Sequence, residues 1–146
     1  MADQERPFRV YTDTSDTASG GVLHQVFEDG IEAPVEYKSK KLTPTEQRYS
    51  VRDRELLAVV HALKSWRHYL MGKHFVLYTD HESLQFLSTM KVDGGDMGKR
   101  VLHWVEFLQQ FDFEVKYIKG ENNIADALTR NETAKQEPEQ ELAEQE

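Results

Sequence analysis

A long helical pattern lies between two strand patterns, and this order constrains the fold more than any other feature of the chain. Residues 8–13 alternate in polarity and residues 75–80 form a nearly continuous apolar run, so both are predicted to be strands. Between them, Thr43 and Glu46 make a capping box, and apolar residues recur at helical spacing to about residue 70. A helical crossover of this length lets the two strands lie side by side and parallel, with the usual right-handed connection.

The rest of the chain supplies three more strands and several shorter helices. Short turns after the first strand predict an antiparallel meander that continues through residues 22–27, which follow a Gly-Gly pair, and residues 33–42. Later patterns predict, in order, a short helix over 82–87, a loop over 90–98, a helix through 101–108, a strand over 113–118 and a closing helix from Asn122 or Asn123 to about Arg130. The predicted fold class is therefore α/β, a mixed five-stranded sheet flanked by helices.

The negative charge is concentrated near the end of the chain. The formal net charge is −8, of which residues 131–146 contribute −5 and residues 1–130 only −3. Residues 131–146 have almost no apolar side chains and are predicted to be a disordered acidic tail or linker after one folded domain, residues 1–130. The basic residues of that domain stand in clusters. They either form ordinary solvated surface or gather on one side that could bind nucleic acid.

The residue types that are missing exclude several classes of protein. The chain has no cysteine, which excludes disulfide scaffolds and thiolate metal sites. No apolar run approaches the roughly 20 residues of a membrane span, and the polar start of the chain lacks the hydrophobic segment of a signal peptide. We therefore expect an intracellular protein, cytoplasmic or nuclear, with no membrane partner.

The tripeptide Tyr-Thr-Asp ends both of the strands that are predicted to be parallel, at residues 11–13 and 78–80. Neighbouring strands lie about 4.8 Å apart, so Asp13 and Asp80 are expected side by side at the carboxyl edge of the sheet, where such sheets place ligands. Two carboxylates so close repel each other unless a cation neutralises them, and oxygen ligands suit Mg²⁺ or Mn²⁺. The alternative is that each Asp only caps the loop after its strand.

Two further acidic residues stand in apolar surroundings. Glu55 shares a helical row with Val59, Ala62 and Trp66, so its carboxylate is expected to lean toward the sheet. Asp126 lies among alanines and larger apolar residues of the closing helix, where a charged group needs a partner. For each of them the alternative is a solvated position on the outside of an amphipathic helix.

Three blocks of the sequence, taken in order and spacing, resemble the RNase H domain of gypsy-type long-terminal-repeat (LTR) retrotransposons. They are YTDTSDTASGGVL, YKSKKLTPTEQRYSVRDRELLAVVHALKSWRHYLMGKHFVLYTDHESL and HWVEFLQQFDFEVKYIKGENNIADALTR. The resemblance covers residues 8–130. It implies an RNase H-like fold and a segment of a reverse transcriptase polyprotein, working in a cytoplasmic virus-like particle or in the nucleus.

The resemblance also implies a catalytic and metal-binding quartet, Asp13, Glu55, Asp80 and Asp126. In such a site two Mg²⁺ ions, which Mn²⁺ could replace, lie about 3.5–4 Å apart and promote hydrolysis of a phosphodiester. Asp13 is expected to bridge both ions, with Glu55 and Asp80 on one and Asp126 on the other. The substrate would be the RNA strand of an RNA–DNA hybrid, and the products a 5′-phosphate and a 3′-hydroxyl.

Substrate contacts are expected from polar and basic residues near this edge of the sheet. Recognition of a hybrid depends on ribose 2′-hydroxyls and duplex shape, and phosphates attract basic side chains. The candidates are Thr14, Ser15 and Asn122 for the 2′-hydroxyls, and Lys38, Lys40 and Arg48 for the phosphates. For any single lysine, ordinary surface charge is the alternative.

The sequence departs from the wider family at two places. Many relatives have a histidine shortly before the final aspartate, and the stretch YIKGENNIAD has none, which predicts slower or altered turnover. The basic protrusion of some cellular relatives is also missing, so we expect an attached polymerase domain to supply much of the affinity. Two alternatives remain at this point: a non-catalytic module that tethers or positions a polymerase, and a nuclease of the same fold that cuts DNA.

Overall fold

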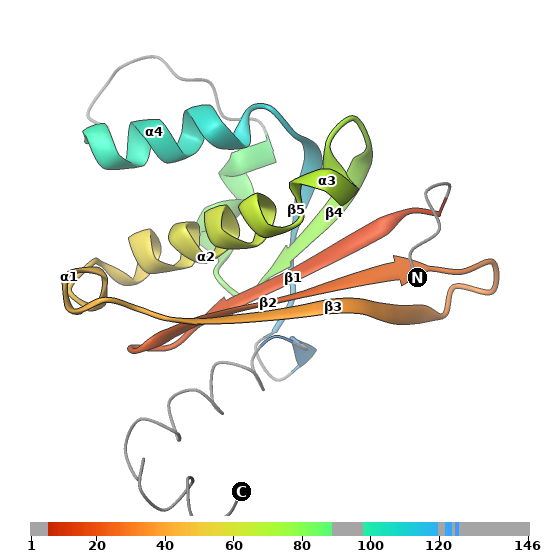
Figure 1. The fold of residues 1–146 in the computed structure, drawn as a ribbon, viewed down its shortest axis with the longest axis horizontal. Helices are drawn as coiled ribbons and strands as arrows, with labels where there is room; N and C mark the ends of the chain where they lie inside the picture. Colours follow the sequence, from red (N-terminus) through yellow and green to blue (C-terminus); the bar gives the residue numbers. More distant parts are fainter. Residues whose placement is uncertain (1–5, 89–97, 120–121, 124, 126–146) are drawn as a thin grey trace, which may run out of the picture.

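The computed structural model describes residues 6–88, 98–119, 122–123 and 125 (Figure 1). The strands are β1 (Phe8–Thr14), β2 (Ala18–Val26), β3 (Glu32–Lys41), β4 (His74–Thr79) and β5 (Asp112–Tyr117). The helices are α1 (Pro44–Gln47), α2 (Val51–Ser65), α3 (Arg67–Leu70), the 3-10 helix η1 (Glu82–Ser88) and α4 (Lys99–Leu108). None of the helices within these ranges combines the length and the apolar character that a membrane crossing requires.

The five strands form one mixed sheet in the order β3-β2-β1-β4-β5. β1, β2 and β3 make an antiparallel meander, and the pairs β1–β4 and β4–β5 are parallel. Helices α2 and α4 lie on the same side of the sheet (Figure 1). The α/β class, the five mixed strands and the parallel placement of the strands around the crossover are therefore confirmed.

The core lies between the sheet and the helices. Leu56, Val59 and Leu63 of α2 pack with Val10 of β1 and Leu77 of β4, and all five side chains are at most 1% exposed. Burying side chains of this size stabilises a fold by about 1.5–3 kcal/mol each. α2 is therefore held firmly over the two strands that carry the Tyr-Thr-Asp repeats.

The crossover is interrupted, so the prediction of a single helix from residue 43 to about residue 70 is wrong. The capping box at Thr43 is present, but α1 spans only Pro44–Gln47. Ser50 then caps a second helix, since its hydroxyl accepts a hydrogen bond from the backbone N–H of Asp53 at 3.1 Å. A second N-cap satisfies the free amides of a new helix and so favours a restart. α2 ends at Trp66, whose φ of −112° is not helical.

β2 begins at Ala18, so the prediction that this strand follows the two glycines is wrong. Both glycines lie within the strand. A Cβ atom on Gly21 would meet Cη2 of Trp66 at 3.1 Å and Cβ of Ala62 at 3.4 Å. Gly21 is therefore required by the close approach of α2 to the sheet and not by a turn, a role that glycine often has within strands.

Candidate metal centre

Two aspartates meet at one edge of the sheet because the two strands that carry them are in matching register. β1 and β4 pair in parallel with Tyr11 opposite Tyr78. Since both strands continue as Tyr-Thr-Asp, this register brings Asp13 level with Asp80. Asp13 is 3% exposed, and Asp80, just after β4, is partly exposed. The predicted meeting of the two carboxylates is confirmed.

α2 brings a third carboxylate to the same edge. Glu55, in the second turn of α2, is 5% exposed, and Val59, the next member of its helical row, is fully buried. One carboxylate oxygen from each of Asp13, Glu55 and Asp80 lies within 4.8 Å of the other two. The prediction that Glu55 leans toward the sheet is confirmed.

The electrostatics of this cluster fit a divalent cation. Burial and then the charges of Asp13 and Asp80 raise the pKa of Glu55 to about 9, with Arg54 opposing them. Oε2 of Glu55 is buried and has no hydrogen-bond partner among the described residues. An unpaired buried carboxylate oxygen is costly, and a hard cation would both satisfy it and relieve the repulsion. The three carboxylates therefore suit Mg²⁺ or Mn²⁺.

Comparison with known proteins identifies the family. A family model described as "RNase H-like domain found in reverse transcriptase" matches residues 3–111. The chain belongs to this family. It is also 40% identical, over 131 residues, to the transposon Tf2-3 and Tf2-4 polyproteins of Schizosaccharomyces pombe. These matches cover 88% of the chain and 10% of each polyprotein.

The chain thus spans about a tenth of the length of these curated relatives, and it is an RNase H domain of the kind carried by LTR retrotransposon polyproteins. The gypsy-type subdivision stays a prediction.

Solved structures show the same fold. A foamy viral protease-reverse transcriptase in complex with an RNA/DNA hybrid matches with a TM-score of 0.60 at 21% identity, over 82% of this chain and 16% of that one. The N-terminal RNase H domain of a Mycobacterium tuberculosis protein matches with a TM-score of 0.62 at 14% identity, over 90% of this chain and 98% of that one. The predicted RNase H-like fold is confirmed.

In this RNase H domain a buried asparagine ties the segment after β5 to the strand that carries Asp13. Nδ2 of Asn123 donates to the carbonyl oxygen of Thr12 at 2.8 Å, and Oδ1 accepts from the backbone N–H of Ala125 at 3.1 Å. Asn123 is 4% exposed. The sequence singled it out only as a possible helix cap and missed this positioning role, because no local pattern shows which strand the loop will meet.

Arg54 ties the turn after β1 to the start of α2. One guanidinium nitrogen donates to the carbonyl oxygen of Gln47 at 3.0 Å, and another lies 3.3 Å from a carboxylate oxygen of Asp16. The side chain of Arg54 is 13% exposed, whereas that of Asp16 is 90% exposed. Arg54 thus fixes the two backbone segments that carry Asp13 and Glu55.

The predicted substrate residues occupy different surroundings. Thr14 and Ser15 form the turn after Asp13, where the Thr14 hydroxyl donates to the carbonyl oxygen of Ala18 at 2.9 Å and the Ser15 hydroxyl accepts from the N–H of Ala18 at 3.1 Å. Both are partly exposed next to the metal centre. They shape the turn, and they stay candidates for contact with substrate.

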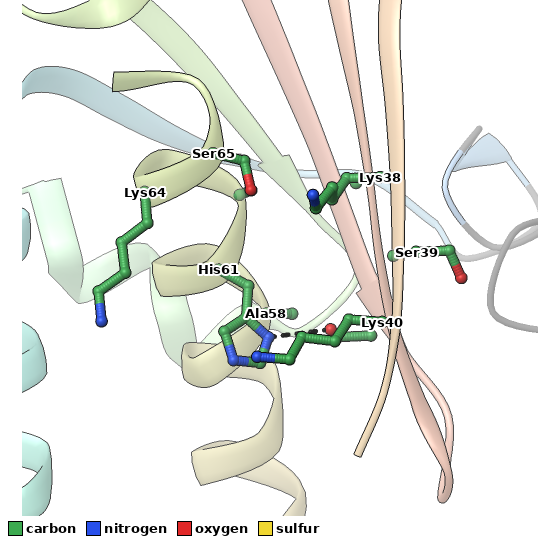
Figure 2. A pocket seen from close by; sticks show the side chains of 11 residues that line it. Lys38, Ser39, Lys40, Ala58, His61, Lys64 and Ser65 are labelled. Atoms are coloured by element: carbon green, nitrogen blue, oxygen red, sulfur yellow. Dashed lines mark hydrogen bonds between the residues drawn. The ribbon is translucent and has the colours of Figure 1, made fainter. Parts of the chain in front are cut away.

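The other candidates lie on β3, at the end of α1 and after β5. Lys38 and Lys40 project from β3 toward α2 and line a pocket (Figure 2). Arg48 is exposed at the end of α1, and Asn122 is exposed after β5. Asp126, the fourth member of the predicted quartet, lies outside the described residues, as do most of the predicted closing helix and the acidic tail.

Proposed function

We propose that this domain is a ribonuclease H, which hydrolyses the RNA strand of RNA–DNA hybrids during reverse transcription of a retrotransposon. The observation that carries the proposal is the convergence of Asp13, Glu55 and Asp80, whose ligand atoms lie within 4.8 Å of one another. Membership of the reverse transcriptase RNase H family supports it. A module that only positioned a polymerase would not need three converging carboxylates, two of them buried.

Divalent cations would be held by Asp13, Glu55 and Asp80, with Asp126 as the fourth ligand that the resemblance implies. Bound at this edge, two such ions would lower the pKa of the attacking water and stabilise the leaving oxygen, so that a 5′-phosphate and a 3′-hydroxyl result. The chain itself fixes the ligands. β1 and β4 set the two aspartates in register, α2 places Glu55 between them, and Arg54 and Asn123 hold the adjoining backbone.

The substrate and the partner of the domain follow from its relatives. The foamy viral enzyme was solved with an RNA/DNA hybrid, and the transposon relatives are polyproteins ten times longer than the match. We therefore assign the hybrid as substrate and a linked reverse transcriptase polymerase as partner. The polymerase would contribute affinity that residues 1–130, with a net charge of −3, lack.

A cleavage assay on a hybrid labelled in its RNA strand tests the proposal. With Mg²⁺ or Mn²⁺ the wild-type chain should cut the RNA, Asp80→Asn should not, and duplex DNA should stay intact. Asp112→Asn is the matched control, since it removes the same charge at the start of β5 and its side chain is 72% exposed. A wild-type chain that cuts no hybrid at high metal and protein concentration would instead support the tethering module.

A further inference from the structure

A pocket of about 410 Å³ lies between α2 and the meander (Figure 2). Its lining does not include the three carboxylate residues of the metal centre. Small residues such as Gly21 and Ala62 line its floor, where the helix packs closely on the sheet. In Figure 2, Lys38 points from β3 toward Ser65 and Lys40 points toward His61. None of the described residues that line the pocket is acidic. Its size suits a small ligand or one unit of a larger one.

The pocket begins one strand away from the metal centre. Gly20 in its lining is the partner of Asp13 in the β1–β2 pairing. Ala58, also in the lining, follows Glu55 by three residues on α2 and so lies on a neighbouring part of the same helix surface. Since adjacent strands are about 4.8 Å apart, a polymer held at the carboxylates could reach the pocket with its next groups.

The polar groups of the pocket are donors. Two of them are the ammonium groups of Lys38 and Lys40, and a third is the hydroxyl of Ser65. His61 adds a fourth when Ser19 donates to its Nδ1, at 3.1 Å, because the other ring nitrogen then carries the proton. Lys64 contributes only its stem, since its ammonium lies 5.7 Å from the centre of the Phe107 ring on α4.

We propose that this pocket binds a backbone phosphate of the nucleic acid, together with its sugar, at a second position beside the scissile one. The phosphate would contact Lys38, Lys40 and Ser65, and the sugar would lie on the small residues of the floor. The identification of the source as nucleic acid rests on the proposed function, whereas the affinity of the pocket for a phosphate group does not. Charge complementarity favours this ligand, because phosphate carries the negative charge that the pocket lacks and offers acceptors to its ammonium and hydroxyl donors.

His61 gives the proposal a readout that does not depend on catalysis. Burial and then the nearby charges of Lys40 and Lys64 lower the pKa of His61 to about 4, while Glu46 opposes them. A bound phosphate would offset the two lysines and therefore raise the pKa of His61. The effect can be followed in the histidine ring signals of the full chain by NMR, with EDTA present so that no hybrid is cut.

The experiment titrates the full 146-residue chain with a short RNA–DNA hybrid and, separately, with inorganic phosphate and an acidic peptide. The hybrid is expected to raise the pKa of His61. The double substitution Lys38→Gln with Lys40→Gln should abolish that response and reduce the slope of log affinity against log salt by about 0.9 for the lost phosphate contact. Lys41→Gln is the matched control. This residue shares β3 but does not line the pocket, so the His61 response should persist.

Three results would overturn the proposal: no change at His61 with saturating hybrid, a response to inorganic phosphate alone, or a response to the acidic peptide alone. The second would mean a small-anion site, and the third a protein partner. If the domain cuts hybrid but the pKa of His61 does not change, the phosphate-binding pocket is refuted and the ribonuclease function is not. If the domain never cuts but the pKa of His61 rises with hybrid, only the ribonuclease function is refuted. The thermal unfolding of the double variant is compared with that of wild type, so that a folding defect is recognised.

Discussion

Replacing Glu55 by glutamine should stabilise the metal-free protein and make its stability less dependent on pH. The pKa of this carboxyl is raised from 4.5 to about 9, chiefly by burial and then by Asp13 and Asp80. Between these two values the native state holds a proton that the unfolded chain has lost. The contribution of Glu55 to stability is therefore fully present below pH 4.5 and is lost as the pH rises toward 9.

The size of the effect follows from the width of that interval. Each pH unit inside this interval lowers the free energy of unfolding by about 1.4 kcal/mol. Between pH 5 and pH 8, wild type should therefore lose about 4 kcal/mol of unfolding free energy relative to Glu55→Gln. Glutamine keeps the shape of the side chain and does not titrate. All other titrating groups are the same in the two proteins. Their effects therefore cancel in the difference between the two free energies of unfolding.

The assay is urea unfolding in EDTA at several pH values, with the free energy of unfolding extrapolated to water. Mg²⁺ should then stabilise wild type and flatten its pH dependence, because binding requires the ionised carboxylate, and it should do less for Glu55→Gln. Glu114→Gln on β5, with a side chain 49% exposed, is the control and should follow wild type. A constant difference between wild type and Glu55→Gln from pH 5 to pH 8 would show that the buried cluster does not hold this proton.

Three further substitutions test the surroundings of the site. Gly21→Ala places a methyl group 3.1 Å from a buried tryptophan ring and should cost about 1–3 kcal/mol in urea unfolding, whereas Gly98→Ala meets nothing within 4 Å and should cost far less. Ser50→Ala removes the cap of α2 and should cost about 1 kcal/mol, measured in the same way. Asn123→Ala breaks the bond to β1 and should cost about 1–3 kcal/mol and also weaken Mg²⁺ binding, followed by calorimetry; unchanged Mg²⁺ affinity would limit its role to folding.

The sequence was sufficient where local pattern and topology agreed. Two identical tripeptides at the ends of strands, joined by a helical crossover, allow only a few arrangements, and the parallel one brings Asp13 and Asp80 together. Glu55 was predictable because its helical row ends in large apolar residues that must face the sheet. In each case the local sequence pattern and the packing of helix on sheet lead to the same placement of the side chain.

The sequence was insufficient where a contact between distant segments decided the outcome. Gly20 and Gly21 look like a turn, but they lie in β2, where Trp66, far along the chain, packs closely on Gly21. Ser50 looks like an ordinary polar residue of a long helix until its cap is seen. The bond from Asn123 to β1 joins residues 111 positions apart, and no local pattern encodes such a separation.

The three carboxylates of the metal centre differ in how much the fold depends on their charge. Asp13 and Glu55 are 3% and 5% exposed, so their repulsion acts in a medium that screens it poorly, whereas Asp80 is partly open to water. Neutralising Asp80 should therefore remove cleavage with little effect on metal-free stability, while neutralising Glu55 should remove cleavage and increase that stability. Repulsion that is relieved only when a cation binds is the expected stability cost of a functional metal site.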